Sequence, residues 1–258
     1  MLLLTLAYGL LWLLRFLVGA SVYSFLNVVV SRVPRGESLV AGRSHCTACG
    51  RVLTAWELVP CFSFLALGGR CHGCGSKIPV RDFWVEVLGG CLALACARTW
   101  GGETARAVLL FLALSVLTVV ALVDWDTLEI WDTCCLLLAL CGLAAGVLFP
   151  DMGWPSRLLG AGIVSVPMLI LALLIPGGFG GGDNKLMAAA GLLLGAANTV
   201  CAAFLAVLSG GLYGGVLLAR RKIGREEHFA FGPFLCAGIA LALFFGEELT
   251  GWYLGLLG

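Results

Sequence analysis

Charged residues are scarce in this sequence. Of its 258 residues only 12% are Asp, Glu, Lys or Arg, whereas 60% are hydrophobic. Soluble domains average about a quarter charged and about half apolar, so this composition excludes an ordinary soluble globular protein. The net charge is only +1, so no excess of positive charge indicates nucleic acid as a partner, and we expect none.

The features of a removable signal peptide are also missing. The first apolar run has no basic segment before it and no Ala-x-Ala cleavage site, so we expect it to be a retained membrane anchor. No internal repeat is evident, which argues against a transporter built from two similar halves.

Long apolar runs are abundant instead, and several could cross about 30 Å of hydrocarbon as helices. We predict an all-α polytopic membrane protein with about eight transmembrane helices, the shortest of which follows Asp183. The apolar runs lie at 2–31, 84–98, 105–123, 133–149, 158–176, 186–198, 199–219 and 230–257.

Positive charges indicate the orientation of these helices. If the long polar stretch 32–82 is cytoplasmic, then alternation makes 124–132, 177–185 and 220–229 cytoplasmic as well. Together these segments hold twelve of the sixteen Lys and Arg residues. Cytoplasmic loops of membrane proteins are enriched in these residues, so the sequence predicts a multi-pass protein in the lipid bilayer with its amino terminus outside.

Four of the twelve cysteines form two Cys-x-x-Cys pairs within 32–82, namely Cys46 with Cys49 and Cys71 with Cys74. A glycine follows each second cysteine and lets the backbone turn, so that four thiolates can face one ion. We predict a structural zinc in a small cytoplasmic loop domain, whose few apolar residues leave the metal to supply much of its folding free energy. A pair of redox dithiols or disulfides is the alternative.

Two carboxylates beside apolar runs are the candidates for chemistry. Asp124 opens the segment 124–132 and Asp183 ends a glycine-rich stretch, and the predicted topology brings both to the cytoplasmic face. Ionisable residues at membrane depth are rare and usually functional. Two carboxylates a few ångströms apart share a proton, so that one can activate water as in an acid protease. A phosphate cradle is the alternative for the glycines, but no strand precedes them.

Four segments of the chain resemble, in order, those of the bacterial type IV prepilin peptidases, also called prepilin leader peptidase/N-methyltransferases, which are GxGD-type intramembrane aspartyl peptidases. The segments are Ser24–Val29 with Arg32–Pro34, Glu57–Pro60 with Gly69–Cys71, Gly180–Leu186, and Phe231–Phe234.

The resemblance implies a bifunctional enzyme of the bacterial inner membrane whose active site faces the cytoplasm. Such enzymes cleave the leader from type IV prepilins or type II secretion pseudopilins, then methylate the new amino terminus with S-adenosylmethionine. The resemblance also implies that Asp124 and Asp183 are the catalytic pair.

We divide the chain into an N-terminal region, 1–104, which includes the zinc loop, and a membrane-embedded peptidase domain, 105–258. No glycine-rich strand–turn–helix marks a methyl-donor site.

Two segments depart from the family's pattern. Trp131 stands where relatives commonly have proline, which predicts a different start to the following helix, and Pro79–Phe83 replaces the usual Ser-x-Arg-Tyr-Pro. A zinc-binding scaffold or transporter without hydrolytic activity is an alternative function. A membrane dithiol oxidoreductase is another, but it would need its Cys-x-x-Cys pairs on the outer face.

The segment 124–132 is acidic, unlike the other polar segments. Besides Asp124 it carries Asp126, Glu129 and Asp132 and no basic residue. The resembled family's substrates have basic leaders, so we expect these three side chains to hold the leader's Lys or Arg. A merely hydrated turn is the alternative.

Overall fold

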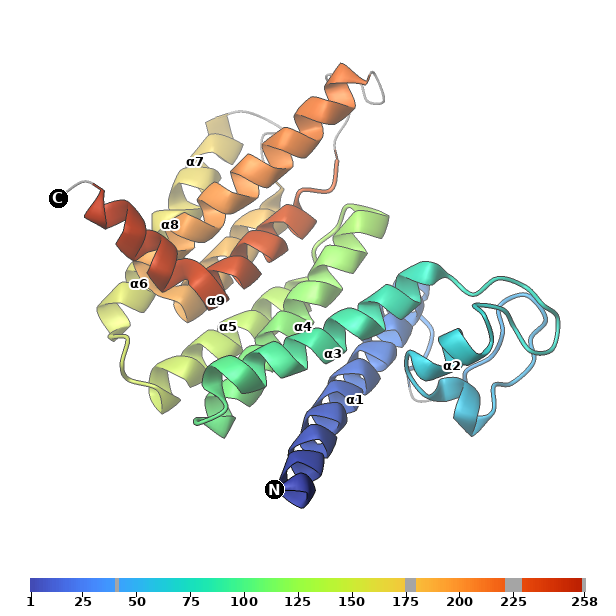
Figure 1. Cartoon of the computed structure of the whole chain (residues 1–258). Coiled ribbons are helices and arrows are strands. Elements are labelled where there is room, and N and C mark those ends of the chain that lie inside the picture. Colours follow the sequence, from blue (N-terminus) through green and yellow to red (C-terminus); the bar gives the residue numbers. More distant parts are fainter. Residues whose placement is uncertain (40–41, 175–179, 221–228, 257–258) are drawn as a thin grey trace. The chain divides into compact units, whose positions relative to one another are not determined.

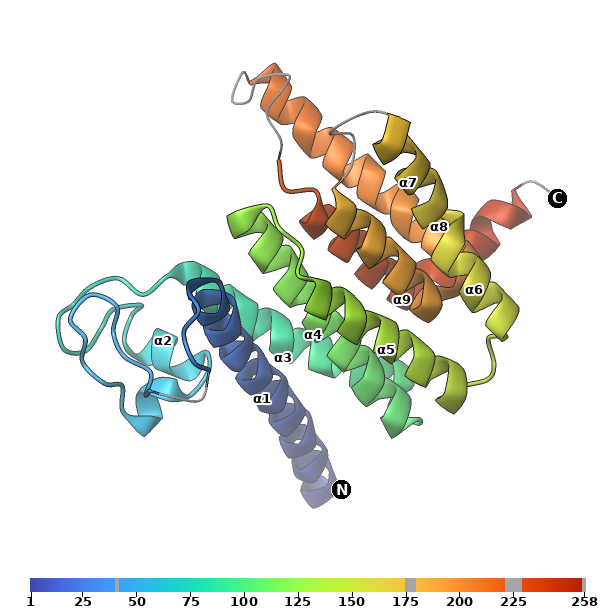
Figure 2. The ribbon, with the colours of Figure 1, turned by 180° about the vertical axis from the view of Figure 1, so that it is seen from behind.

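The computed structural model describes residues 1–39, 42–174, 180–220 and 229–256, and within these it is helical, with two isolated β-bridges and no longer strand (Figures 1 and 2). The chain forms two compact units, Met1–Phe111 and Leu112–Gly258, each described by itself below. Two parts of the sequence predictions lie outside the described residues. One is the part of the glycine-rich stretch at 177–179, and the other is three of the basic residues predicted to be cytoplasmic, Arg221, Lys222 and Arg225.

Two long helices of the first unit, α1 (Leu2–Arg32) and α3 (Val80–Trp100), pack against each other (Figure 1). A glycine makes their contact close, because a Cβ added to Gly89 would collide with the ring of Tyr23, which is fully buried. Dispersion contacts of this kind hold helices together in lipid, where the hydrophobic effect does not favour their association.

The connection between α1 and α3 contains three short helices, η1 (Val33–Arg35), η2 (Ala55–Leu58) and α2 (Phe62–Ala66). Helix α2 is fixed to α3 by two contacts. The rings of Phe64 and Phe83 stack with centroids 4.7 Å apart, and the backbone N–H of Cys61 donates a hydrogen bond of 2.7 Å to the carboxylate of Glu86. The loop is therefore attached to the first turns of a long helix.

The second unit is a helix bundle organised around α8, which packs against α5, α6 and α9. Its core contains fully or almost fully buried Leu114, Leu186, Met187 and Ile239. The helices are α4 (Thr104–Thr127), whose first turns belong to the first unit, α5 (Asp132–Leu148), α6 (Trp154–Ile163), α7 (Ser165–Leu174), α8 (Gly181–Ala219) and α9 (Gly232–Gly255).

Helix α8 consists of two helical segments joined at Gly195. This residue has φ +72° and ψ 176°, a conformation that side chains disfavour. A Cβ there would also lie 2.4 Å from the sulfur of Met152, which follows the end of α5, and 2.9 Å from the hydroxyl of Ser156, so both side chains would have to shift. The sequence predicted two apolar runs here, and their boundary at 198/199 falls just after this break.

The two halves of α8 run in opposite directions. Gly182, at the start of α8, packs against Ile130 just before α5, whereas the break at Gly195 lies beyond the far end of α5. The second half returns, because Gly210 packs against Phe231 at the start of α9. One helical element therefore crosses the bundle twice.

Two neighbouring residues of α6 pair with backbone groups around this break. The hydroxyl of Ser156 accepts a hydrogen bond of 3.3 Å from the N–H of Ala196. The guanidinium of Arg157 donates to the carbonyl of Leu192, at 2.9 Å, and to that of Phe149 at the end of α5, at 3.4 Å. Arg157 is only 3% exposed, and its positive charge suits the carbonyl ends of these helices.

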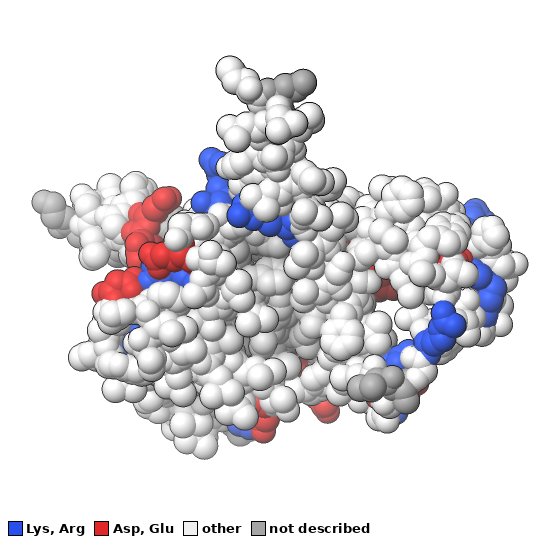
Figure 3. Space-filling model, turned by 90° about the horizontal axis from the view of Figure 1, so that it is seen from below, with Lys and Arg blue, Asp and Glu red and all other residues white. Residues whose placement is uncertain are grey.

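Among the described residues, five helices are long and apolar enough to cross a membrane, namely α1 with η1, α4, α6 with α7, α8, and α9. The surface seen in Figure 3 is mostly uncharged, with the charged side chains in small groups. The predicted all-α polytopic class is confirmed. The number eight stays a prediction, because α3 and the shorter α5 are not among the five.

We expect Arg157→Met to lower the free energy of unfolding of the purified protein by about 1–3 kcal/mol, because it leaves buried carbonyls without donors. Arg157→Lys should lose less. Thermal unfolding in detergent measures both. Arg98→Gln, at an exposed arginine of α3, is the control and should unfold as the unsubstituted protein does. Unfolding of Arg157→Met at the temperature of the unsubstituted protein would contradict the role given to Arg157.

Candidate active site and metal centre

The two Cys-x-x-Cys pairs adopt the same backbone structure, which we call the first and second knuckle. In each, the N–H of the first cysteine donates to a carbonyl beyond the turn, and the glycine after the second cysteine donates back. The bonds are Cys46 N to Arg51 O, 2.9 Å; Gly50 N to Cys46 O, 2.9 Å; Cys71 N to Ser76 O, 2.8 Å; and Gly75 N to Cys71 O, 2.9 Å. Both glycines have φ +71°, so they make the turns that the sequence predicted.

The four sulfurs of the knuckles have the spacing of a metal site. All lie within 4.8 Å of one another, and the sulfurs of Cys46 and Cys74 are 3.9 Å apart. Zinc with Zn–S bonds of about 2.3 Å holds its ligands about 3.8 Å apart in a tetrahedron. All twelve cysteines are free thiols. The predicted ligands, Cys46, Cys49, Cys71 and Cys74, thus come together and fit one ion.

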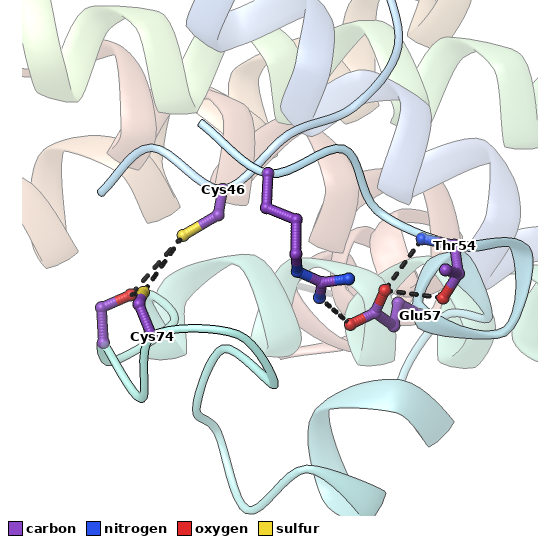
Figure 4. A network of polar contacts seen from close by, with 6 residues as sticks. Cys46, Thr54, Glu57 and Cys74 are labelled. Atoms are coloured by element: carbon purple, nitrogen blue, oxygen red, sulfur yellow. Dashed lines mark hydrogen bonds and ion pairs between the residues drawn. The ribbon is translucent and has the colours of Figure 1, made fainter. Parts of the chain in front are cut away.

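A buried ion pair supports the first knuckle (Figure 4). Glu57, which is 8% exposed, pairs with the guanidinium of Arg51 and accepts hydrogen bonds from the N–H and hydroxyl of Thr54, at 2.8 and 2.6 Å. Arg51 and then Thr54 hold the pKa of Glu57 at about 2, so this carboxylate is ionised at neutral pH. Sequence reasoning missed the pair, although Glu57 lies in one of the family-like segments.

Asp124 lies in the last turn of α4 and is only 5% exposed. Its Oδ2 accepts a hydrogen bond of 2.8 Å from the N–H of Gly232, the first residue of α9. The first N–H groups of a helix have no partner within it and favour a negative charge. A Cβ on Gly232 would lie 2.7 Å from the same oxygen, so only glycine permits this approach.

Asp183 lies in the first turn of α8 and is partly buried. Its Oδ2 accepts a hydrogen bond of 3.2 Å from the N–H of Gly180. Asp183 and Asp124 are close enough to interact electrostatically. The structure therefore brings together the two carboxylates that the sequence singled out, and places each at the amino end of a helix.

The starts of α5 and α8 are joined beside Asp183. The ammonium of Lys185 lies 2.7 Å from the carboxylate of Asp132, and both side chains are more than half exposed. A Cβ on Gly182 would lie 2.7 Å from that of Ile130. Asp132 therefore links the starts of the two helices. The expectation that Asp126, Glu129 and Asp132 hold the basic residues of a leader stays a prediction.

Aromatic side chains from three helices gather next to Asp124, a feature that sequence reasoning missed. Trp125 of α4 contacts Tyr213 of α8, with ring centroids 6.1 Å apart, and Tyr213 contacts Phe234 of α9 at 5.2 Å. Phe229 lies 6.0 Å from Tyr213. These rings hold the ends of α4 and α8 against the start of α9. The segment Phe231–Phe234 was the signal that could have indicated this.

Two family models match the chain. Residues 17–100 match the bacterial peptidase A24 N-terminal domain, and residues 111–215 match the type IV leader peptidase family. A prepilin leader peptidase/N-methyltransferase of Bacillus subtilis is 32% identical over 93% of this chain and 96% of its own length. Those of Aeromonas salmonicida and Aeromonas hydrophila are 33% and 34% identical over 98–99% of both chains. No solved structure matches.

The chain belongs to the type IV leader peptidase family.

The predicted resemblance is confirmed, and with it the prediction of a peptidase over a scaffold, a transporter or an oxidoreductase. The five apolar helices found in the described part of the chain and the family together indicate a multi-pass protein of the inner membrane.

One departure from the family's pattern has little effect on the backbone. Trp131 precedes the first residue of α5 with φ −71°, close to the φ of about −65° that a proline ring imposes. Helix α5 therefore begins at Asp132 with the backbone that proline would favour. The expected change in the start of this helix is not seen.

We expect Gly232→Ala to lower leader cleavage by this leader peptidase family member at least about 100-fold, because the new methyl group displaces the Asp124 carboxylate. Cleavage of a prepilin by purified protein measures it. Gly211→Ala is the control, since a Cβ on Gly211 meets nothing within 4 Å. Equal loss of activity in the two variants would show that the contact with Asp124 is not the cause.

Proposed function

We propose that this protein cleaves the leader peptide of type IV prepilins or type II secretion pseudopilins with Asp124 and Asp183 as its catalytic pair, at the cytoplasmic face of the membrane. The observation that carries the proposal is that these carboxylates lie near enough to interact electrostatically in the second unit, each held by a glycine N–H at the amino end of a helix. The printed names of the relatives supply the prepilin substrate.

In the proposed mechanism the pair shares one proton. The ionised carboxylate takes a proton from a water molecule as that water attacks the scissile carbonyl carbon. The protonated carboxyl gives its proton to the carbonyl oxygen. Collapse of the tetrahedral intermediate breaks the carbon–nitrogen bond, and the amine leaves with the proton that came from water. As the carbonyl re-forms, its oxygen returns a proton to the carboxylate that gave one, so the pair again holds one shared proton. The glycine amides hold both carboxylates in position and need no rearrangement during these steps.

We also propose that the protein methylates the new amino terminus with S-adenosylmethionine, as the printed names of its relatives suggest. The described residues contain no strand–turn–helix of the nucleotide-binding kind, so no residue is assigned to the methyl donor and no step is derived for it. The division into an N-terminal region, 1–104, and a peptidase domain, 105–258, belongs to the same proposal.

The four thiols are proposed to hold one structural zinc. Four thiolates fill the coordination sphere and leave no position for an activated water, so the bound metal would cross-link the two knuckles and take no part in hydrolysis. The spacing of the sulfurs and the shared backbone structure of the knuckles support this role.

Asp124→Asn and Asp183→Asn should each lower leader cleavage at least about 100-fold, since neither variant has the shared proton. Purified protein incubated with a prepilin, with the mass loss read by mass spectrometry, measures this. Glu248→Gln, at an exposed carboxylate of α9, is the control. Metal content should be unchanged in all three variants. Full activity in either aspartate variant would refute the proposed pair.

The remaining acids of the segment 124–132 are proposed to bind the basic leader. Asp126, Glu129 and Asp132 are all exposed, and Asp132 also forms the ion pair with Lys185 that links α5 to α8, so the test leaves Asp132 unchanged. Exposed ion pairs contribute about 0.2–1 kcal/mol each. The double variant Asp126→Asn/Glu129→Gln should therefore raise KM a few fold, and more at low salt than at high salt.

A substrate whose leader Lys and Arg are replaced by Gln is the control for this prediction. It should show the same KM with the double variant and the unsubstituted protein at both salt concentrations. If the double variant leaves the KM of the basic-leader substrate unchanged at low salt, the segment is only a hydrated turn.

A further inference from the structure

The two knuckles match beyond the hydrogen bonds that form their turns. A third bond also occurs in both, from Leu53 N to Ser44 O, 2.9 Å, and from Ile78 N to Gly69 O, 2.8 Å. Equivalent positions can therefore be compared directly. The residue two places after the second cysteine is Arg51 in the first knuckle and Ser76 in the second. Both side chains carry hydrogen-bond donors.

Ser76 lies against sulfurs of both knuckles. Its hydroxyl oxygen is 3.1 Å from the sulfur of Cys74 and 3.6 Å from the sulfur of Cys46, the contacts drawn in Figure 4. A thiol can donate to this hydroxyl, but a metal-bound cysteine has lost its proton. In the metal-bound state the hydroxyl must therefore be the donor and a sulfur the acceptor.

Arg51 occupies the equivalent place on the other side. Its guanidinium interacts with the thiol of Cys71, the first cysteine of the opposite knuckle. A Cβ on Gly73 would lie 2.9 Å from its Nε. This Nε is buried and has no hydrogen-bond partner among the described residues, although Nη2 is paired with Glu57. A donor buried without an acceptor is costly, so a guanidinium held in this way next to the Cys71 thiol needs an explanation.

The charge of a four-thiolate zinc site supplies that explanation. Four thiolates and one Zn²⁺ carry a net charge of −2, and partners outside the ligands stabilise such charge and orient the ligands. Resting on the zinc proposed above, we infer that Arg51 and Ser76 are paired positioning residues of the metal site. Arg51 donates a hydrogen bond to the thiolate of Cys71 in the opposite knuckle, and Glu57 holds Arg51 in place to do so. Ser76 donates to one of the two thiolates that its hydroxyl contacts, Cys74 or Cys46.

The test is the rate at which the full-length protein in detergent loses zinc to an excess of a chromogenic chelator. Each variant is first analysed for metal, and about one zinc per chain is expected. Ser76→Ala and Arg51→Lys should then release zinc about 10-fold faster than the unsubstituted protein, or more. Ser76→Ala removes only a hydroxyl, so it tests the inference even if Arg51→Lys fails to fold.

Two neighbours provide matched controls. Ser44→Ala removes a hydroxyl near the first knuckle, and Lys77→Gln removes an exposed positive charge beside Ser76. Both should release zinc at the unsubstituted rate, and equal acceleration by the controls would overturn the inference. Release from Ser76→Ala within two-fold of the unsubstituted rate would overturn it too. Unsubstituted protein without zinc would instead refute the metal site itself, and the inference with it.

Discussion

Helix ends compensate the charges inside the second unit, and the sign of each charge matches the end that it meets. Asp124 and Asp183 accept hydrogen bonds from N–H groups at the amino ends of α9 and α8. Arg157 donates to carbonyls at the carboxyl ends of α5 and of the first half of α8. Little water reaches charged side chains inside an apolar bundle, so a charge without a hydrogen-bonding partner there would be very costly. Backbone N–H and carbonyl groups therefore stabilise these charges in a bundle that has few charged side chains to do so.

This compensation depends on a broken helix. If α8 continued without interruption through Gly195, the backbone groups that Ser156 and Arg157 contact would be paired within the helix. The break lets α8 turn back, so that its first turn lies beside Ile130 and its second half beside Phe231. The position of Asp183 in the bundle therefore follows from a glycine far from it in the structure and from two residues of α6.

The exposed ion pair of Asp132 and Lys185 joins the start of α5 to the start of α8, the segment that carries Asp183. Lys185 is the fifth residue of α8, close to the amino end of the helix, where the helix dipole disfavours a positive charge. Asp132, at the first position of α5, offsets that charge and links the starts of the two helices. An exposed pair contributes little to stability, so we interpret its role as fixing the direction of the turn that carries Asp183.

Sequence alone determined the class of the protein and the family, and it singled out candidate residues for the chemistry. Scarce charge and long apolar runs specify a helical membrane protein, because lipid demands backbone groups paired within each segment. Cys-x-x-Cys spacing and the rarity of aspartate at membrane depth singled out the four thiols and the two carboxylates, since both are local signals. Their catalytic and metal-binding roles remain proposals. The number of membrane crossings also stays a prediction, because α3 and α5, which the apolar runs 84–98 and 133–149 predicted, are not among the five helices long and apolar enough to span.

Only the tertiary structure decided which groups hold these residues in place. The N–H of Gly232, the carbonyls at Arg157 and the pairing of Lys185 with Asp132 join positions distant in the chain. A sequence does not distinguish a glycine that lets a carboxylate approach the backbone, such as Gly232, from a glycine that reverses a helix, such as Gly195. The reversal of α8 at Gly195 decides which distant residues meet, and it depends on backbone angles and packing that apolar periodicity does not encode.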